Sequence, residues 1–140
     1  MAANKEDLKD KYMEFQMLMQ QLQQLQQNIT SLEKHVVDLR SLDNNLDVVL
    51  NSKTGSETLV PLGSGIFLKG ILKETDNVVM NIGANACVEK TIDEAKETIN
   101  KQLEEVSSVL ERMQEEDVRL GVRIQELQTE FQDLKESELE

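Results

Sequence analysis

The residue types that most often perform chemistry are scarce in this chain. His35 is the only histidine and Cys87 the only cysteine, so one chain supplies neither a Cys/His zinc cluster nor a Ser-His-Asp triad. Gly63-Ser64-Gly65 lacks the following Gly-Lys-Ser/Thr of a phosphate-binding loop and is expected to form a turn. Cys87 falls in an expected strand, where a buried structural thiol is favoured over a nucleophile. We therefore expect no catalytic residue, no metal, no cofactor and no enzymatic activity.

The many acidic residues do not point to catalysis either. Asp and Glu number 27 against 15 Lys and Arg, which gives a net charge of −12. They are dispersed over expected helix surfaces, whereas a catalytic carboxylate pair needs a pocket that shifts its proton affinity. A charge of −12 also disfavours nucleic acid and anionic membranes, both of which carry phosphate. An acidic chain suits a basic or protein partner.

The expected compartment is the cytoplasm. A single cysteine allows no internal disulfide, as is usual in reducing compartments. The N-terminal sequence MAANKEDLKDKY contains no apolar stretch that could act as a signal peptide. No apolar run reaches the length that a membrane-spanning helix requires.

Two long segments carry a seven-residue repeat of apolar residues, the pattern of a coiled coil. Residues 5–50 contain neither Gly nor Pro. Their a positions are Leu8, Phe15, Leu22, Ile29, Val36, Asp43 and Leu50, and their d positions are Lys11, Leu18, Leu25, Leu32, Leu39 and Leu46. In residues 91–136 the d positions are Ile92, Ile99, Val106, Met113, Leu120, Leu127 and Leu134, and the a positions are Lys96, Leu103, Leu110, Asp117, Ile124 and Phe131. Thr91 and Glu94 form a capping box that predicts the start of the second helix.

Two helices of equal length are expected to fold back on each other, with the a positions of one facing the d positions of the other. One such register places Leu22 opposite Leu120, and a slip of one heptad would preserve the same pattern. The charged residues at these positions, Lys11, Asp43 and Asp117, are expected to fix the register rather than to perform chemistry.

Residues 51–90 have a different character, with short β-rich runs between turn residues. We expect strands at 58–60, 66–72, 78–82 and 86–89, paired in two hairpins with turns at 61–65 and 83–85. The expected organisation is an N-terminal helix (1–50), two β-hairpins (51–90) and a C-terminal helix (91–140). The expected fold class is therefore α+β but mainly helical, a long antiparallel coiled coil with two β-hairpins at its hinge.

The β segment is too small to support a core of its own, yet it holds the densest apolar sequence in the chain. Exposed strand edges and apolar faces must be covered, so we expect this segment to assemble with other chains. The expected oligomerisation residues are Val60, Ile66, Phe67, Leu68, Ile71, Leu72, Val78, Val79, Met80 and Ile82.

Residues 59–70, LVPLGSGIFLKG, and 78–91, VVMNIGANACVEKT, resemble the alpha-class subunit of prefoldin. The resemblance extends over the whole chain, because the arm lengths and the two-hairpin insert agree as well. It implies two alpha-type subunits assembled with four beta-type subunits through a β-barrel body, from which six coiled coils project. It further implies that the coiled-coil tips hold unfolded polypeptides without ATP and pass them to a group II chaperonin.

The free end of the expected coiled coil is rich in flexible apolar side chains. Met1, Met13, Met17 and Met19 all fall in the first part of the chain, and thioether side chains suit promiscuous apolar binding. The expected client-binding residues are Leu8, Tyr12, Met13, Phe15, Met17, Met19, Leu127, Phe131 and Leu134. The alternative is that these methionines pack in the coiled coil or form ordinary surface.

Other interpretations stay open. The outer face of the first arm is crowded with glutamines (Gln16, Gln20, Gln21, Gln23, Gln24, Gln26 and Gln27). They could form a polar cavity wall or simply a solvated face of good helix formers. A scaffolding coiled coil that binds one specific helical partner is the main functional alternative, although a scaffold has no need of an oligomerising β insert. A membrane tether is disfavoured because the sequence offers no anchor or lipidation site.

Overall fold

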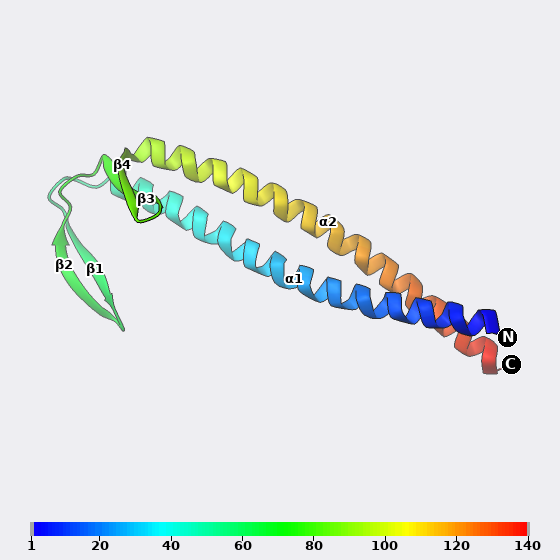
Figure 1. Cartoon of the computed structure of the whole chain (residues 1–140). Coiled ribbons are helices and arrows are strands. Elements are labelled where there is room, and N and C mark those ends of the chain that lie inside the picture. Colours follow the sequence, from blue (N-terminus) through cyan, green and yellow to red (C-terminus); the bar gives the residue numbers. More distant parts are fainter. Residues whose placement is uncertain (1, 140) are drawn as a thin grey trace. The chain divides into compact units, whose positions relative to one another are not determined.

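The chain consists of two long helices separated by two β-hairpins (Figure 1). The computed structural model describes residues 2–139, and side chains from residue 5 to residue 136. The elements are, in order, α1 (Ala2–Leu50), β1 (Glu57–Gly63), β2 (Ile66–Ile71), β3 (Asn77–Gly83), β4 (Ala86–Thr91) and α2 (Ile92–Leu139). The predicted mainly helical α+β class is confirmed, and Met1 lies outside the described residues.

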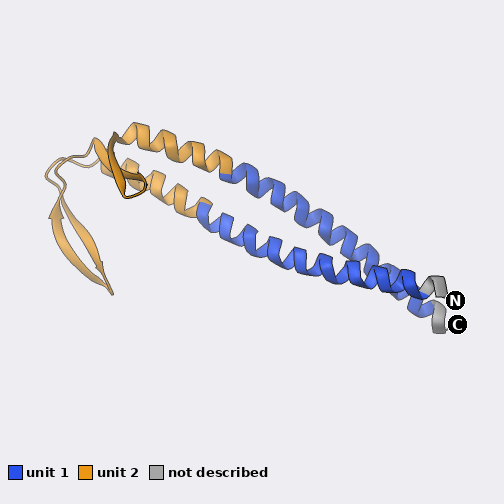
Figure 2. Cartoon of the chain, in the orientation of Figure 1, with its two compact units in different colours: residues 1–35, 106–140 blue, residues 36–105 orange. Residues whose placement is uncertain are grey.

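The chain divides into two compact units (Figure 2). Unit 1 comprises residues 1–35 and 106–140, and its described residues belong to α1 and α2. Unit 2 comprises residues 36–105, which hold the end of α1, both hairpins and the start of α2. Each helix therefore contributes to both units.

Unit 1 is an antiparallel pair of helices. The Nζ of Lys11 on α1 lies 3.2 Å from Oε2 of Glu130 on α2. The expected register places Lys11 opposite Phe131, the next residue along α2, so this ion pair agrees with it. The apolar a and d positions of unit 1 form the seam between the helices, and Leu127 is fully buried there. The predicted coiled-coil pairing is confirmed for this unit.

Unit 2 is held by a seam between the end of α1 and the start of α2 and by the hairpin connections. Its buried apolar side chains are Val36, Leu39 and Leu46 from α1 and Ile92, Ala95 and Ile99 from α2. Lys96 of α2 contacts Asp43 and Asp47 of α1, on either side of Leu46, the residue expected opposite Lys96. Among the described a and d positions of both helices, only Leu50 is exposed.

The two hairpins share one design. β1 pairs with β2 and β3 with β4, both antiparallel, and each pairing shifts just before the turn, at Gly63 and at Gly83. In the first turn Ser64 and Gly65 both have positive φ, of 50° and 79°. This pair of left-handed residues matches the right-handed twist of the strands that it joins. Pro61, which we expected in the turn, lies within β1, because the turn itself takes only two residues.

Local hydrogen bonds fix both ends of the β segment. The N–H of Glu94 donates to the Thr91 hydroxyl at 3.1 Å, which confirms the predicted helix cap. The N–H of Ile92 donates to the carbonyl of Asp76 at 2.8 Å and ties the start of α2 to the link between the hairpins. At the other end, the N–H of Gly55 donates to the carbonyl of Leu72 at 2.8 Å. Gly55 has a φ of 89°, which the turn after α1 requires and which glycine adopts without strain.

Candidate interaction surfaces

The β1–β2 hairpin is apolar on both faces. Residues directly opposite each other share a face, so Val60 and Leu68 lie on one side and Pro61 and Phe67 on the other. Phe67 and Leu68 are each 56% exposed although they point to opposite sides. A two-stranded hairpin cannot bury either face by itself. Both faces of β1–β2 therefore need cover from outside the hairpin.

The β3–β4 hairpin is partly covered by the helices on one of its two faces. Val78 and Met80 share a face, are half-buried and line an apolar groove of about 390 Å³ with Leu46 and Ile99 of the helices. The opposite face carries Asn81, Cys87 and Glu89 beside an exposed Val79, and Val79 and Asn81 also border the groove at the strand edge. This hairpin is thus partly covered within unit 2, unlike β1–β2.

The expected oligomerisation residues differ in accessibility. Seven are exposed, namely Val60, Ile66, Phe67, Leu68, Ile71, Val79 and Ile82. Leu72, Val78 and Met80 are half-buried. Three further exposed apolar residues of the hairpins, Leu59, Leu62 and Val88, escaped the sequence analysis. The signal that could have found them is the alternation of side chains between the two faces of each strand.

The expected client-binding residues all lie in unit 1 and fall into two groups. Tyr12, Met13, Met17 and Met19 are exposed, between 44% and 60%. Leu8, Phe15, Phe131 and Leu134 are half-buried, and Leu127 is fully buried in the seam. The ring of Phe131 links the groups, with its centroid 6.0 Å from that of Tyr12 and 5.7 Å from that of Phe15. Leu127 becomes accessible only if the helices separate.

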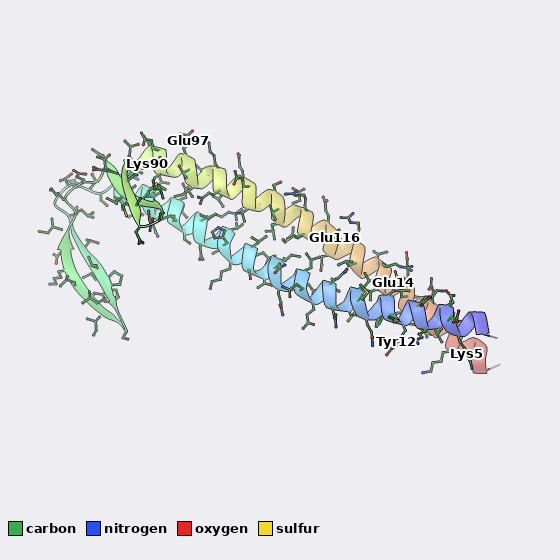
Figure 3. The ribbon with its side chains drawn as sticks, in the orientation of Figure 1. Lys5, Tyr12, Glu14, Lys90, Glu97 and Glu116 are labelled. Carbon is green, nitrogen blue, oxygen red and sulfur yellow. The ribbon has the colours of Figure 1, made fainter. Side chains whose placement is uncertain are left out.

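Ion pairs across unit 1 surround this aromatic cluster. The Arg123 guanidinium donates two hydrogen bonds to the carboxylate of Glu14, at 3.0 and 3.2 Å. These bonds lower the pKa of Glu14, against the opposing effect of desolvation. The hydrogen bond to Glu130 raises the pKa of Lys11. Figure 3 shows Tyr12 and Glu14 close together along α1, so apolar and charged contacts occur in the same part of the seam.

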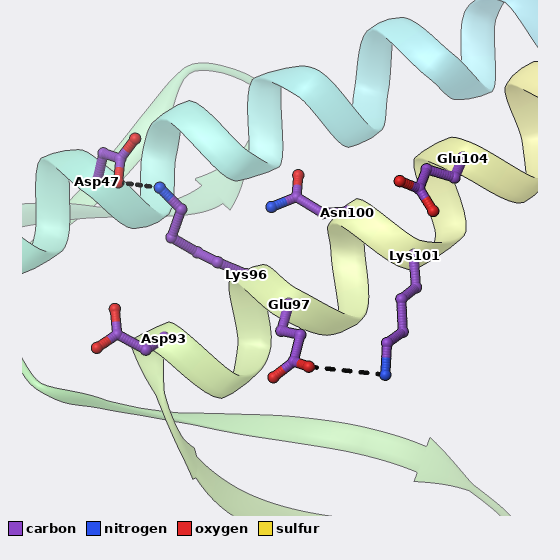
Figure 4. A pocket seen from close by; sticks show the side chains of 7 residues that line it. All are labelled: Asp47, Asp93, Lys96, Glu97, Asn100, Lys101 and Glu104. Carbon is purple, nitrogen blue, oxygen red and sulfur yellow. Dashed lines mark hydrogen bonds and ion pairs between the residues drawn. The ribbon is translucent and has the colours of Figure 1, made fainter.

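A charged groove of about 510 Å³ lies in unit 2 (Figure 4). Lys96 of α2 reaches across to the carboxylate of Asp47 on α1, and its Nζ lies 3.9 Å from Oδ1 of Asp43. The hydrogen bond to Asp47 raises the pKa of Lys96. Among the described residues no group of three or more His, Cys, Asp or Glu is arranged to hold a metal ion. At this groove the ion pairs of Lys96 with Asp43 and Asp47 link α2 to α1.

The prediction that Cys87 is buried is wrong. Cys87 is exposed, because it pairs with Asn81 on the polar face of the β3–β4 hairpin and not on the face of Val78 and Met80. His35 is exposed on α1. Over residues 2–139, neither helix has a stretch both long enough and apolar enough to cross a membrane.

Comparison with known proteins decides the family. The family described as prefoldin subunit matches residues 18–137, most of the chain and all of its described strands. The chain belongs to the prefoldin family. Prefoldin subunit alpha of Pyrococcus horikoshii is 32% identical over 141 residues, which cover 99% of this chain and 94% of that relative. Prefoldin subunit alpha of Methanobrevibacter smithii is 38% identical over 89 residues, 64% of this chain and 60% of the relative.

A solved prefoldin structure has the same fold. A chain from the cryo-EM structure of filamentous PFD from Methanocaldococcus jannaschii superposes with a TM-score of 0.71 at 23% identity. The match covers 82% of this chain and 95% of that one. Prefoldins are a family of non-enzymatic chaperones, and membership in it gives this chain a chaperone-type role and assembly with other prefoldin subunits.

Proposed function

We propose that this chain is the alpha-type subunit of a cytoplasmic, ATP-independent holdase that binds unfolded polypeptides through unit 1. The observation that carries the proposal is the exposure of Tyr12, Met13, Met17 and Met19 beside the Phe131 cluster. Large apolar side chains normally leave water, and flexible methionines adapt to apolar partners of many shapes. Four of them exposed within a short stretch of one helix suit clients without a fixed structure.

The chain works as part of an assembly with other prefoldin subunits. Both faces of β1–β2 are apolar and open, so neighbouring subunits must cover them. We place two copies of this chain with four single-hairpin, beta-type subunits in one body, with β1–β2 as the main contact. The groove lined by Val78 and Met80 keeps β3–β4 in contact with the helices of unit 2.

The complex then passes the bound client to a group II chaperonin. A holdase only keeps its client from aggregating, so we assign the folding of that client to the chaperonin. The net charge of −12 favours docking on a basic surface of that chaperonin.

The test is suppression of aggregation by the assembled complex. The purified chain and a single-hairpin prefoldin subunit are mixed, and a chemically denatured reporter enzyme is diluted into the mixture without nucleotide. Light scattering is expected to fall relative to either subunit alone, and later addition of a group II chaperonin with ATP should restore reporter activity. Unchanged scattering, together with tight binding to a single defined helical protein, would favour the scaffold instead.

A further inference from the structure

One side of unit 1 carries no charge between residues 12 and 26 of α1 and between residues 114 and 132 of α2. In the heptad pattern the e and b positions of the two antiparallel helices lie on the same side of the seam, and the g and c positions lie on the other. On α1 the e and b positions hold Tyr12, Gln16, Met19, Gln23 and Gln26. On α2, between residues 114 and 132, they hold only glutamines, one valine and one glycine. We call this side the neutral flank.

The opposite side of unit 1 is charged and more covered. Glu14, Arg123 and Glu130 occupy g positions there and are half-buried, since their ion pairs lie over the seam. The e positions of the neutral flank behave differently, because Tyr12 is 55% exposed and Met19 44% exposed. Ion pairs therefore shield the apolar seam on the charged side near Phe131, whereas farther along the helices a groove of about 310 Å³ between Gln21, Asn28 and Glu116 reaches Leu25 and Leu120 on that same side.

Gly121 lies in the middle of the neutral flank. Its φ is not in the left-handed region, and a Cβ built on it would meet no atom within 4 Å. Neither backbone geometry nor packing thus requires glycine, which weakens the middle of a helix relative to alanine. The expected register places Met19 across from it, between the layers of Leu18 and Leu22. Because Gly121 has no side chain, the surface of the neutral flank is recessed there, next to the flexible side chain of Met19.

We propose that the neutral flank is the surface on which an extended, uncharged segment of a client lies, which rests on the proposed holdase function. A charge that loses water without a partner is costly, so a surface free of charge selects a client segment free of charge. Glutamine side chains both donate and accept hydrogen bonds, and can therefore pair with the unpaired N–H and C=O groups of an extended backbone of any sequence. A helical partner would instead need a regular apolar stripe, which the glutamines at these positions do not provide.

The experiment compares two double variants of the assembled complex. Gln16→Glu with Gln23→Glu places two charges on the neutral flank. Gln24→Glu with Ser31→Glu places the same two charges on the other side of α1, at exposed positions with the same spacing. The probe is a fluorescent, unstructured peptide of Ser, Asn, Val and Leu. Its binding should weaken about tenfold for the first pair and less than about twofold for the second.

The outcomes separate this inference from the holdase proposal. If the wild-type complex does not slow aggregation of a denatured reporter, the holdase proposal fails. If it does so while both double variants bind the peptide equally well, only the neutral flank is wrong. A change in the mass of the complex with Gln16→Glu and Gln23→Glu, at unchanged peptide affinity, also overturns the inference, since the flank would then join subunits. Circular dichroism of each variant verifies that the helices are intact.

Discussion

Glu14 on α1 and Arg123 on α2 form a bidentate ion pair across unit 1. The guanidinium Nε donates to Oε1 at 3.0 Å and Nη2 donates to Oε2 at 3.2 Å. The pair joins two residues far apart in sequence and requires the antiparallel pairing of α1 with α2 that the heptads predict. A planar, two-bond contact of this kind specifies geometry better than a single-bond ion pair does.

This pair makes the stability of unit 1 depend on pH. The pKa of Glu14 in the folded chain is lowered from its ordinary 4.5 by the hydrogen bonds from Arg123. Its stabilisation is therefore present above pH 4.5 and is lost as the pH falls through the lowered pKa. We expect Glu14→Gln to lower the melting temperature by a few degrees at most near neutral pH, and the difference from wild type to shrink at an acid pH well below 4.5, as Glu14 takes up a proton. Thermal unfolding followed by circular dichroism at both pH values measures it.

Glu126→Gln is the matched control for the ion pair. Glu126 also bonds Arg123, at 3.3 Å, but from the same helix. Its replacement should change the melting temperature less than Glu14→Gln does. An equal effect of the two substitutions would show that the cross-helix bond contributes nothing to the pairing of α1 with α2.

A disulfide across the seam tests the register directly. With Cys87 replaced by Ser, Leu22→Cys and Leu120→Cys should form an intramolecular bond under mild oxidation, because the register places them opposite each other. Closing a loop of this length should stabilise the chain by about 4–5 kcal/mol against unfolding. Non-reducing electrophoresis and thermal unfolding report both effects. Pairing of Leu22→Cys with Leu127→Cys or Met113→Cys, but not with Leu120→Cys, would reveal a slip of one heptad.

The methionines of unit 1 can be tested together. Met13→Gln, Met17→Gln and Met19→Gln replace exposed thioethers with polar side chains that favour helix, so the fold should persist. Suppression of reporter aggregation should weaken several-fold while the mass of the complex stays unchanged. The matched control changes the same residues to Leu, which keeps the apolar surface and should retain most of the activity. Full activity of the Gln variant would remove the methionines from client binding.

A charge on the exposed β1–β2 hairpin should impair assembly with other subunits. Phe67→Glu puts a charge on a face that we assign to a neighbouring subunit, where burying it should cost several kcal/mol and weaken assembly at least about a hundredfold. Val37→Glu is the control, since Val37 is similarly exposed but lies on α1, outside the hairpins. Analytical ultracentrifugation with the single-hairpin partner measures both. Normal assembly of the Phe67 variant would mean that this face stays open to water.

Much of the fold could be predicted because its determinants are local and repeated. The heptads name the seam residues without knowledge of the partner helix, and among these only Leu50 is exposed. Thr91 and Glu94 predict the start of α2 within one residue, because capping is a local hydrogen-bond pattern. The family could be inferred from the hairpin sequences for a similar reason, since tight turns demand particular residues.

The wrong or missing predictions concern features that depend on which face of a strand is covered or on contacts between distant parts of the sequence. Cys87 was misplaced because a strand has two faces, and only the packing of Val78 and Met80 against the helices shows which face is covered. The Glu14–Arg123 pair was missed because g positions meet only once the register is known. Pro61 was assigned to the turn on propensity, whereas it occupies a strand that lacks a neighbour on one side and so tolerates a missing N–H.

The central claim is that β1–β2 is uncovered in the single chain and is covered by partner subunits. Hydrogen–deuterium exchange of residues 57–71, measured with native mass spectrometry on the chain alone and with a single-hairpin prefoldin subunit, tests it most directly. We expect fast exchange in the chain alone, and strong protection in a complex of about two copies of this chain and four of its partner. A monomer that already protects these amides, or a complex that leaves them exchanging as before, would contradict the account.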